Sequence, residues 1–354
     1  QKRKVLTAAS YTSWKSERYF FDEETKMMFD RLNKDLGQYE IGISAFNKEE
    51  TVYIIRTYSD RSLGSYYIYD KITDKLDKIV DVSPWIDENE MASTTPVKYQ
   101  SRDGLTINGY LTLPKGYTME TAKNLPVIVN PHGGPWARDE WGFNPEIQFL
   151  ANRGYAVFQM NFRGSTGYGK AFWQASFKKW GLEMQDDITD GTNWLINQGI
   201  ADPKRITIYG GSYGGYATLM GLVKEPNMYA AGVDYVGVSN MFTFMNTIPP
   251  YWKPMLDMFY EMVGDPKADS LMLREVSPVY QAEKIVAPLF VAQGANDPRV
   301  NKDESDQMVA ALKARGIDVE YLVKDNEGHG FHNEENKFEF YRAMEAFLAK
   351  HMTK

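Results

Sequence analysis

The chain has 354 residues, of which 43% are hydrophobic, 14% aromatic and 25% charged, a balance typical of a globular protein. Its 40 Lys and Arg against 47 Asp and Glu give a formal net charge of −7, which argues against a nucleic-acid partner. Cysteine is absent, which excludes disulfides, thiolate zinc sites and a cysteine nucleophile. No apolar run approaches the ~18 to 20 residues of a membrane span, so no membrane partner is expected.

The first 94 residues predict a β-rich segment. Two stretches, residues 17–29 and 65–76, each combine an aromatic strand, a charged turn and a second strand. Their aromatic centres, Phe20 and Tyr67, are separated by roughly one propeller-blade repeat of ~40 to 50 residues. A propeller typically has ~4 to 8 blades. We therefore expect residues 1–94 to be the remnant of a propeller, with a β-extension of chance similarity as the alternative.

Residues 95–354 predict an α/β domain, because strand-like runs alternate with amphipathic helical segments. One helical stripe consists of Met184, Ile188, Gly191 and Leu195, and another of Met308, Ala311 and Leu312. A helix after nearly every late strand indicates a mostly parallel sheet with helices on both faces. The expected strands are 97–100, 106–113, 126–130, 155–160, 205–209, 230–236, 288–293 and 319–323.

A serine nucleophile is predicted at Ser212. The expected strand 205–209 runs directly into Gly210-Gly211-Ser212-Tyr213-Gly214, and a helix-compatible stretch follows. This pattern puts the serine on a sharp turn, where flanking glycines avoid collision with neighbouring backbone. The same turn directs the Tyr213 amide towards the place where negative charge develops in acyl transfer, so it is a candidate oxyanion-hole donor. A purely structural glycine-rich turn is the alternative.

His329 is the expected general base. A serine hydroxyl needs a base that is itself oriented by a carboxylate, and the chain contains only four histidines. His351 lies near the end of the chain, and His132 precedes the serine. His329 follows the last expected strand between two glycines, which let the imidazole approach the serine. His332 lacks such neighbours and is the weaker candidate, and a solvated loop histidine is the remaining alternative.

Asp297 is the expected carboxylate. It follows the strand 288–293, at the carboxyl end where open α/β sheets place their sites. An acid in such a loop is otherwise a turn former. The order Ser212, Asp297, His329 is, however, the order of nucleophile, acid and base expected on such a sheet. Asn301 and Glu304, just beyond, resemble a capping box that opens the next helix.

A second oxyanion donor is expected from the glycines after the strand 126–130. The segment His132-Gly133-Gly134-Pro135 has bare backbone that can approach the serine, and the amide of Gly133 or Gly134 can donate. Glycine-rich turns also bind phosphate, but no Gly-Lys-Ser/Thr follows. The loop 161–169, Asn-Phe-Arg-Gly-Ser-Thr-Gly-Tyr-Gly, similarly opens no nucleotide-binding helix and is interpreted as structural.

Together these segments resemble the prolyl oligopeptidase family of serine peptidases, in which a β-propeller caps an α/β-hydrolase domain. The resemblance implies peptide hydrolysis without metal or cofactor, with Ser212 as nucleophile, His329 as base and Asp297 as its partner. The His-Gly-Gly-Pro form is similar to the acylaminoacyl-peptidase and bacterial dipeptidyl-peptidase branches. Other branches carry a tyrosine where His132 stands. The matching segments are 132–135, 161–165, 180–181, 210–216, 297–300 and 327–331.

The resemblance also implies short peptide substrates and an apolar pocket for the residue before the scissile bond. The residues carried over to this pocket are Tyr213, Val238, Met241, Phe244, Arg299 and Val300. Plain core packing is an equal alternative for Met241 and Phe244. The family's propeller excludes folded proteins and often holds the substrate's amino terminus. Residues 1–94 supply too little of a propeller to decide whether dipeptides, acylated residues or internal bonds are cleaved. A carboxylesterase and a catalytically silent scaffold are the alternative functions, and a homo-oligomer is compatible with the sequence.

Overall fold

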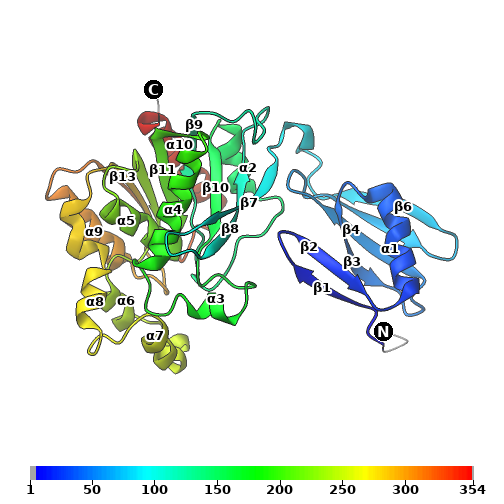
Figure 1. Cartoon of the computed structure of the whole chain (residues 1–354), viewed down its shortest axis with the longest axis horizontal. Coiled ribbons are helices and arrows are strands. Elements are labelled where there is room, and N and C mark those ends of the chain that lie inside the picture. The colour runs from blue at the N-terminus through cyan, green and yellow to red at the C-terminus, as the bar shows by residue number, and fades with distance from the viewer. Residues whose placement is uncertain (1–4, 353–354) are drawn as a thin grey trace. The chain divides into compact units, whose positions relative to one another are not determined.

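The computed structural model describes residues 5–352, and its contacts divide the chain into two units (Figure 1). The first unit runs to Pro96 and includes residues 112–116 and 140–153. The second consists of residues 97–111 and 117–139 and the chain from Gly154 onwards. The domain boundary expected at residues 94/95 stays a prediction. Between residues 5 and 352, no helix combines the length and apolar character needed to cross a membrane.

The first unit is β-rich. Strands β1 (Ala8–Thr12) and β2 (Ser16–Phe20) form an antiparallel pair. Strands β3 (Glu40–Phe46), β4 (Val52–Tyr58), β5 (Ser65–Asp70) and β6 (Lys75–Asp81) form a four-stranded antiparallel sheet in chain order. Four antiparallel strands in this arrangement have the form of a propeller blade, which confirms the expected blade-like segment. The unit also contains the short helices η1 (Glu88–Glu90) and α2 (Pro145–Asn152).

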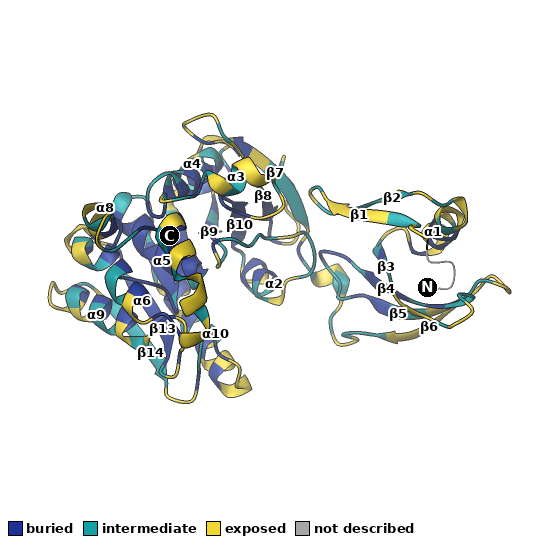
Figure 2. Ribbon diagram, turned by 90° about the horizontal axis from the view of Figure 1, so that it is seen from below, coloured by how far each residue is buried: buried dark blue, intermediate teal, exposed yellow. Residues whose placement is uncertain are grey.

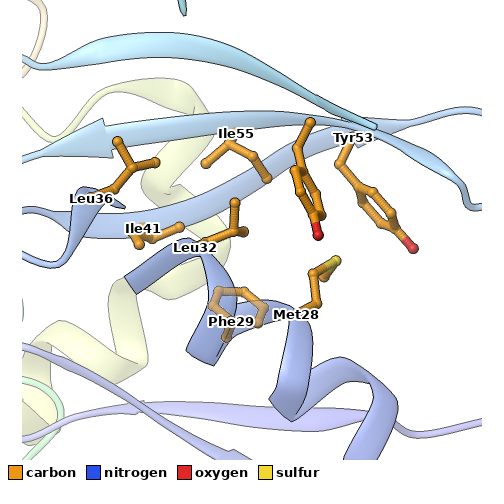
Figure 3. Close-up of a cluster of buried hydrophobic side chains, with 8 residues drawn as sticks. Met28, Phe29, Leu32, Leu36, Ile41, Tyr53 and Ile55 are labelled. Atoms are coloured by element: carbon orange, nitrogen blue, oxygen red, sulfur yellow. The ribbon is translucent and has the colours of Figure 1, made fainter. Parts of the chain in front are cut away.

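The strand–turn–strand pattern predicted for residues 17–29 is wrong beyond β2, because Glu23–Leu36 form helix α1. The Asp22 carboxylate caps this helix by accepting from the Thr25 backbone N–H at 2.8 Å. Its buried side chains recur at helical spacing and pack into the core that Figure 3 shows. That core consists of Met28, Phe29, Leu32, Leu36, Ile41, Tyr53, Ile55 and Tyr69. The second predicted stretch is correct, since its strands are β5 and β6.

The second unit is built on an eight-stranded sheet in the order β14-β13-β12-β11-β9-β10-β8-β7. Every strand predicted after residue 95 is present in it. In the part of the sheet that runs from β14 to β10, each strand is parallel to its neighbours, as expected for an α/β domain. The strands are β7 (Thr94–Gln100), β8 (Thr106–Thr112), β9 (Leu125–Val129), β10 (Ala156–Asn161), β11 (Ala201–Gly211), β12 (Ala231–Tyr235), β13 (Leu289–Gly294) and β14 (Val319–Lys324).

Helices cover both faces of this sheet. Because side chains alternate along a strand, Ile208 and Tyr209 of β11 point to opposite faces. Ile208 packs under Gly221 of α5 (Tyr213–Lys224), whereas the ring of Tyr209 lies 6.5 Å from that of Phe340 in α10 (Glu334–His351). Figure 2 shows the central strands and α5 buried along most of their length. The other helices are α3 (Lys170–Gln174), α4 (Glu183–Asn197), α6 (Met241–Asn246), η2 (Pro250–Met255), α7 (Leu256–Met262), α8 (Ser270–Glu275), η3 (Pro278–Lys284) and α9 (Lys302–Lys313).

The strand order reverses next to β9, and this places the site. From β9 the chain moves to β10 on one side, then returns to β11 on the other side of β9. The loops that leave β9 and β11 therefore diverge at the carboxyl edge of the sheet, where open α/β sheets form their binding crevice. The loop after β9 carries the predicted oxyanion glycines, and the loop after β11 carries Ser212.

Candidate active site

Ser212 lies on a strained turn between β11 and α5. Its φ of 59° is in the left-handed region, which is costly for a residue with a side chain and is characteristic of functional turns. The neighbouring glycines are needed for space. A Cβ on Gly210 would lie 2.6 Å from the backbone of Gly214, and one on Gly214 would lie 2.2 Å from the carbonyl oxygen of Pro131. The absence of side chains at these glycines thus allows the turn that carries Ser212 to pack closely against the loop that follows β9.

The structure brings Ser212, His329 and Asp297 together from the ends of β11, β14 and β13. His329 Nε2 lies 2.9 Å from Ser212 Oγ, and His329 Nδ1 lies 2.7 Å from Asp297 Oδ2. The Asp297 side chain is fully buried and that of His329 is 14% exposed. This is the relative arrangement of a nucleophile, a base and the carboxylate that orients the base.

Backbone groups hold the Asp297 carboxylate in place. Its Oδ1 accepts hydrogen bonds from the backbone N–H of Arg299 at 2.8 Å and of Val300 at 2.9 Å. Gln293 Nε2 lies 3.3 Å from Oδ2, the oxygen that faces His329. The turn after β13 therefore fixes the carboxylate independently of the histidine.

A second buried carboxylate, Glu327, shapes the loop that carries His329. It accepts hydrogen bonds from the backbone N–H groups of His332 and Asn333 and from the side-chain amide of Asn336. Burial alone raises the pKa of Glu327, but these hydrogen bonds outweigh it and lower that pKa to about 2. His332, the weaker candidate base, thus contributes its backbone amide to the loop.

The glycines after β9 lie against the nucleophile turn. A Cβ on Gly133 would lie 3.0 Å from the carbonyl oxygen of Gly211 and 3.5 Å from Ser212 Cβ. Gly134 lines the same cavity as Ser212 and His329. Within residues 5–352 its N–H has no hydrogen-bond partner. The Tyr213 N–H is at the first position of α5, where no intrahelical partner exists. Two backbone donors are therefore available beside the serine.

A cavity of about 260 Å³ opens beside Ser212. Of the pocket residues predicted from sequence, Tyr213, Val238, Phe244, Arg299 and Val300 line it. Met241 is fully buried and is absent from the lining, in keeping with the core-packing alternative. Most of the aromatic and methionine side chains of the lining were not predicted from the sequence; these are Trp136, Trp180, Trp252, Met255, Met258 and Phe259.

The capping box expected at Asn301 and Glu304 is only half present. Asn301 caps α9 with its side-chain oxygen, which accepts from Asp303 N–H at 3.2 Å. The Glu304 carboxylate instead accepts from the backbone N–H groups of Ser239 and Asn240 at 2.9 and 2.8 Å, and from Thr243 Oγ1. Burial raises the pKa of Glu304, and these hydrogen bonds oppose the rise. Glu304 therefore anchors the segment that follows Val238 of the cavity wall.

Comparison with known proteins gives the same family as the motifs. A model of the prolyl oligopeptidase family matches residues 141–354. Dipeptidyl aminopeptidase BIII of Pseudoxanthomonas mexicana is 38% identical over 343 residues, 94% of this chain and 50% of that protein. The acylamino-acid-releasing enzyme of Arabidopsis thaliana is 31% identical over 241 residues, 66% of this chain and 31% of that protein. The acylaminoacyl peptidase of Pyrococcus horikoshii superposes with a TM-score of 0.76 at 26% identity, over 88% of this chain and 50% of that one.

The chain thus spans half or less of the length of these relatives. The matched region nevertheless contains Ser212, Asp297 and His329 together with the strands that carry them. The expected α/β-hydrolase fold is confirmed by the family match and by the superposition. On these grounds the chain belongs to the prolyl oligopeptidase family of serine peptidases.

Proposed function

We propose that this chain hydrolyses short peptides through an acyl-enzyme intermediate on Ser212. The observation that carries the proposal is the continuous contact from Ser212 Oγ through the His329 imidazole to Asp297. A serine hydroxyl becomes a competent nucleophile when such a base removes its proton during attack. No cofactor takes part in these steps.

In the first half-reaction Ser212 Oγ attacks the peptide carbonyl carbon while His329 Nε2 accepts the hydroxyl proton. The negative charge that develops on the carbonyl oxygen is stabilised by the N–H groups of Tyr213 and Gly134. His329 then donates its proton to the leaving amine, and the acyl group stays on Ser212 as an ester. Asp297 accepts the Nδ1–H throughout and stabilises the imidazolium.

In the second half-reaction water takes the place of the amine. His329 removes a proton from the water as it attacks the ester carbonyl, and the same two N–H groups stabilise the second tetrahedral intermediate. The proton then passes to Ser212 Oγ, which leaves as the hydroxyl. A carboxylic acid is released and the enzyme returns to its starting state.

The cavity supports an apolar side chain on the residue before the scissile bond. Its walls are mainly Trp, Phe, Met and Val, which favour burial of apolar surface over that of a charge. Arg299 lines the same cavity with an exposed side chain and can donate to a substrate carbonyl. We therefore expect proline, alanine or larger apolar residues at this position.

The test compares wild type with Ser212→Ala, and with Ser270→Ala, a serine of α8 that does not line the cavity. A fluorophosphonate probe should label wild type and Ser270→Ala but not Ser212→Ala, and aminoacyl anilides should be hydrolysed in the same pattern. Full activity in Ser212→Ala would refute the proposal. Turnover of acyl esters without anilides would favour a carboxylesterase, and no labelling of folded wild type would favour a silent scaffold.

A further inference from the structure

The loop that carries His329 has to cross two strands to reach the nucleophile. In the sheet, β13 and β12 lie between β14, from which the loop starts, and β11, at whose end Ser212 lies. Over β13 the loop lies directly on the strand end, since a Cβ on Gly294 would collide with the carbonyl oxygen of Gly328. The imidazole still has to be carried past β12 before its Nε2 lies 2.9 Å from Ser212 Oγ. A contact at the end of β12 therefore bears on where the base is placed.

Tyr235, the last residue of β12, makes that contact with its side chain. Its hydroxyl accepts a hydrogen bond from the backbone N–H of Phe331, two residues after His329. A Cβ on Gly330 would lie 3.6 Å from the same hydroxyl. The Tyr235 ring stacks on Phe340 of α10 at 4.6 Å and meets the Phe331 ring edge-on at 5.2 Å. The two residues that follow His329 thus lie against one tyrosine, whose own ring is fixed by packing.

The backbone of Tyr235 is tied to the nucleophile turn. Its carbonyl oxygen accepts from the Ser212 N–H at 2.8 Å, and a Cβ on Gly211 would lie 3.5 Å from the edge of its ring. The next residue, Val236, has a φ of 51°, in the left-handed region that is costly for a β-branched residue and is characteristic of functional turns. Its N–H donates to the Ala292 carbonyl oxygen of β13 at 2.9 Å. Tyr235 therefore contacts the nucleophile through its backbone and the loop of the base through its hydroxyl.

We propose that Tyr235 is a positioning residue for the general base: its hydroxyl holds the loop after β14 against the end of β12 and keeps the His329 imidazole within reach of Ser212 Oγ. The inference rests on the proposed function. Tyr235 does not line the cavity, so it acts through the loop and not on the substrate. Its role differs from that of Asp297, which orients the imidazole ring by accepting from Nδ1. Tyr235 fixes the backbone from which that ring extends.

The test compares Tyr235→Phe with Tyr99→Phe. Tyr235→Phe removes the acceptor for the Phe331 N–H and keeps the ring that stacks on Phe340. Tyr99, in β7 at the other edge of the sheet, also has one hydrogen bond to a backbone group, which it donates to the Asp187 carbonyl oxygen. We expect Tyr235→Phe to lower kcat for aminoacyl anilides about 10-fold with KM unchanged, within the roughly 100-fold loss that a 1 Å misplacement can cause. Tyr99→Phe should keep the wild-type kcat, and thermal midpoints of both variants confirm that they are folded.

A second measurement follows the base directly. The proton that His329 Nδ1 donates to Asp297 gives a proton NMR signal far downfield of the amides, and its absence from His329→Ala identifies it. This signal should shift or broaden in Tyr235→Phe and stay unchanged in Tyr99→Phe. A wild-type kcat in Tyr235→Phe, an equal loss in Tyr99→Phe, or a lower kcat with an unchanged signal would overturn the inference, while wild-type activity leaves the proposed function intact. A folded wild type that neither hydrolyses peptides nor labels at Ser212 would remove both.

Discussion

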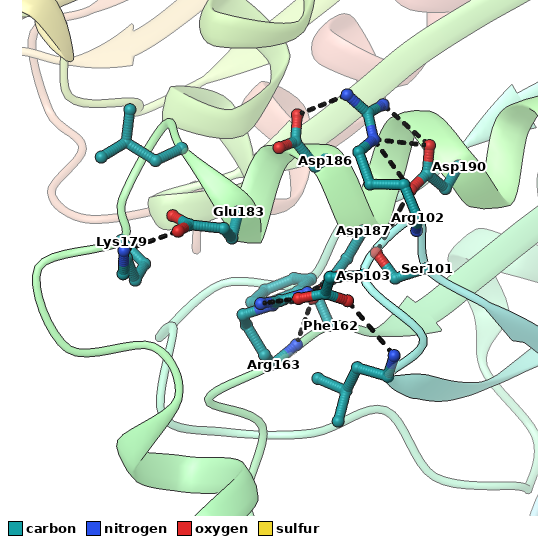
Figure 4. Close-up of polar contacts among 12 residues, drawn as sticks. Ser101, Arg102, Asp103, Phe162, Arg163, Lys179, Glu183, Asp186, Asp187 and Asp190 are labelled. Atoms are coloured by element: carbon teal, nitrogen blue, oxygen red, sulfur yellow. Dashed lines mark hydrogen bonds and ion pairs between the residues drawn. The ribbon is translucent and has the colours of Figure 1, made fainter.

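Replacement of Arg163 by methionine should destabilise the protein far more than the same replacement of Arg102, which also pairs with an aspartate of α4. Both arginines pair bidentately with aspartates of α4, but their surroundings differ (Figure 4). The Arg163 side chain is 6% exposed and its partner Asp187 is fully buried, whereas the Arg102 side chain is 50% exposed. Arg163→Met therefore leaves a carboxylate in the interior without its cation.

The expected magnitudes follow from burial. Breaking a buried pair by removing one partner costs about 3 to 5 kcal/mol, and an exposed pair contributes about 0 to 1 kcal/mol. At about 2 to 4 °C per kcal/mol for a domain of this size, Arg163→Met should lower the thermal midpoint by roughly 6 to 20 °C and Arg102→Met by no more than about 4 °C. Scanning calorimetry of the two variants beside wild type measures both shifts.

A pH series makes the test sharper. Burial already raises the pKa of Asp187 in the presence of Arg163, and losing the cation raises it further. When the pKa of a carboxyl group is higher in the folded than in the unfolded state, the free energy of unfolding of the protein falls as the pH rises and increases again on acidification. The gap between Arg163→Met and wild type should therefore shrink between pH 7 and pH 5, by up to about 1.4 kcal/mol per pH unit. Equal shifts for both arginines, or a gap that does not change with pH, would refute this reasoning.

Three further predictions concern the nucleophile turn and its surroundings. Gly210→Ala should abolish fluorophosphonate labelling because its Cβ would lie 2.6 Å from Gly214 backbone, whereas Gly211→Ala, whose Cβ would meet its nearest atom at 3.5 Å, should be labelled like wild type. Burial raises the pKa of Asp234 to about 7, so wild type should lose stability as the pH rises towards 7. Urea unfolding should then show that the free energy of unfolding of Asp234→Asn, relative to wild type, is about 2 to 3 kcal/mol higher at pH 7 than at pH 5. Glu304→Ala, which leaves buried backbone donors of residues 239 and 240 unpaired, should lower the free energy of unfolding by about 1 to 3 kcal/mol and raise KM, and Glu304→Gln, which keeps one acceptor oxygen, should lose less.

The strands and the catalytic order could be predicted from the sequence because their signals are local. A strand buried on both faces is a short apolar run, and the glycines around Ser212 mark the turn that follows it. The order of Ser212, Asp297 and His329 then needs only the direction of parallel strands, whose carboxyl ends share one edge. For the same reason Gly133 and Gly134 could be assigned to this edge before their contacts were known.

The features that the sequence did not predict depend on distant partners. Glu304 has the spacing of a capping box, but its carboxylate is used by residues some sixty positions earlier in the chain, which no local pattern indicates. Trp252 and Met258 line the cavity from η2 and α7, short helices without a periodic signal. In the first unit, the run Met27-Met28-Phe29 suits a strand as well as a helix, and the Asp22 cap decides for α1.

Two residues of the turn after β13 both anchor the Asp297 carboxylate and line the cavity. The backbone N–H groups of Arg299 and Val300 hold Asp297, and both residues also line the cavity. Exchanging the side chains of these two residues can change the cavity wall and leave the anchored acid undisturbed. Inserting or deleting a residue there displaces both at once. The cavity can therefore be changed by substitution at these two positions, provided that their spacing from Asp297 in the chain is kept.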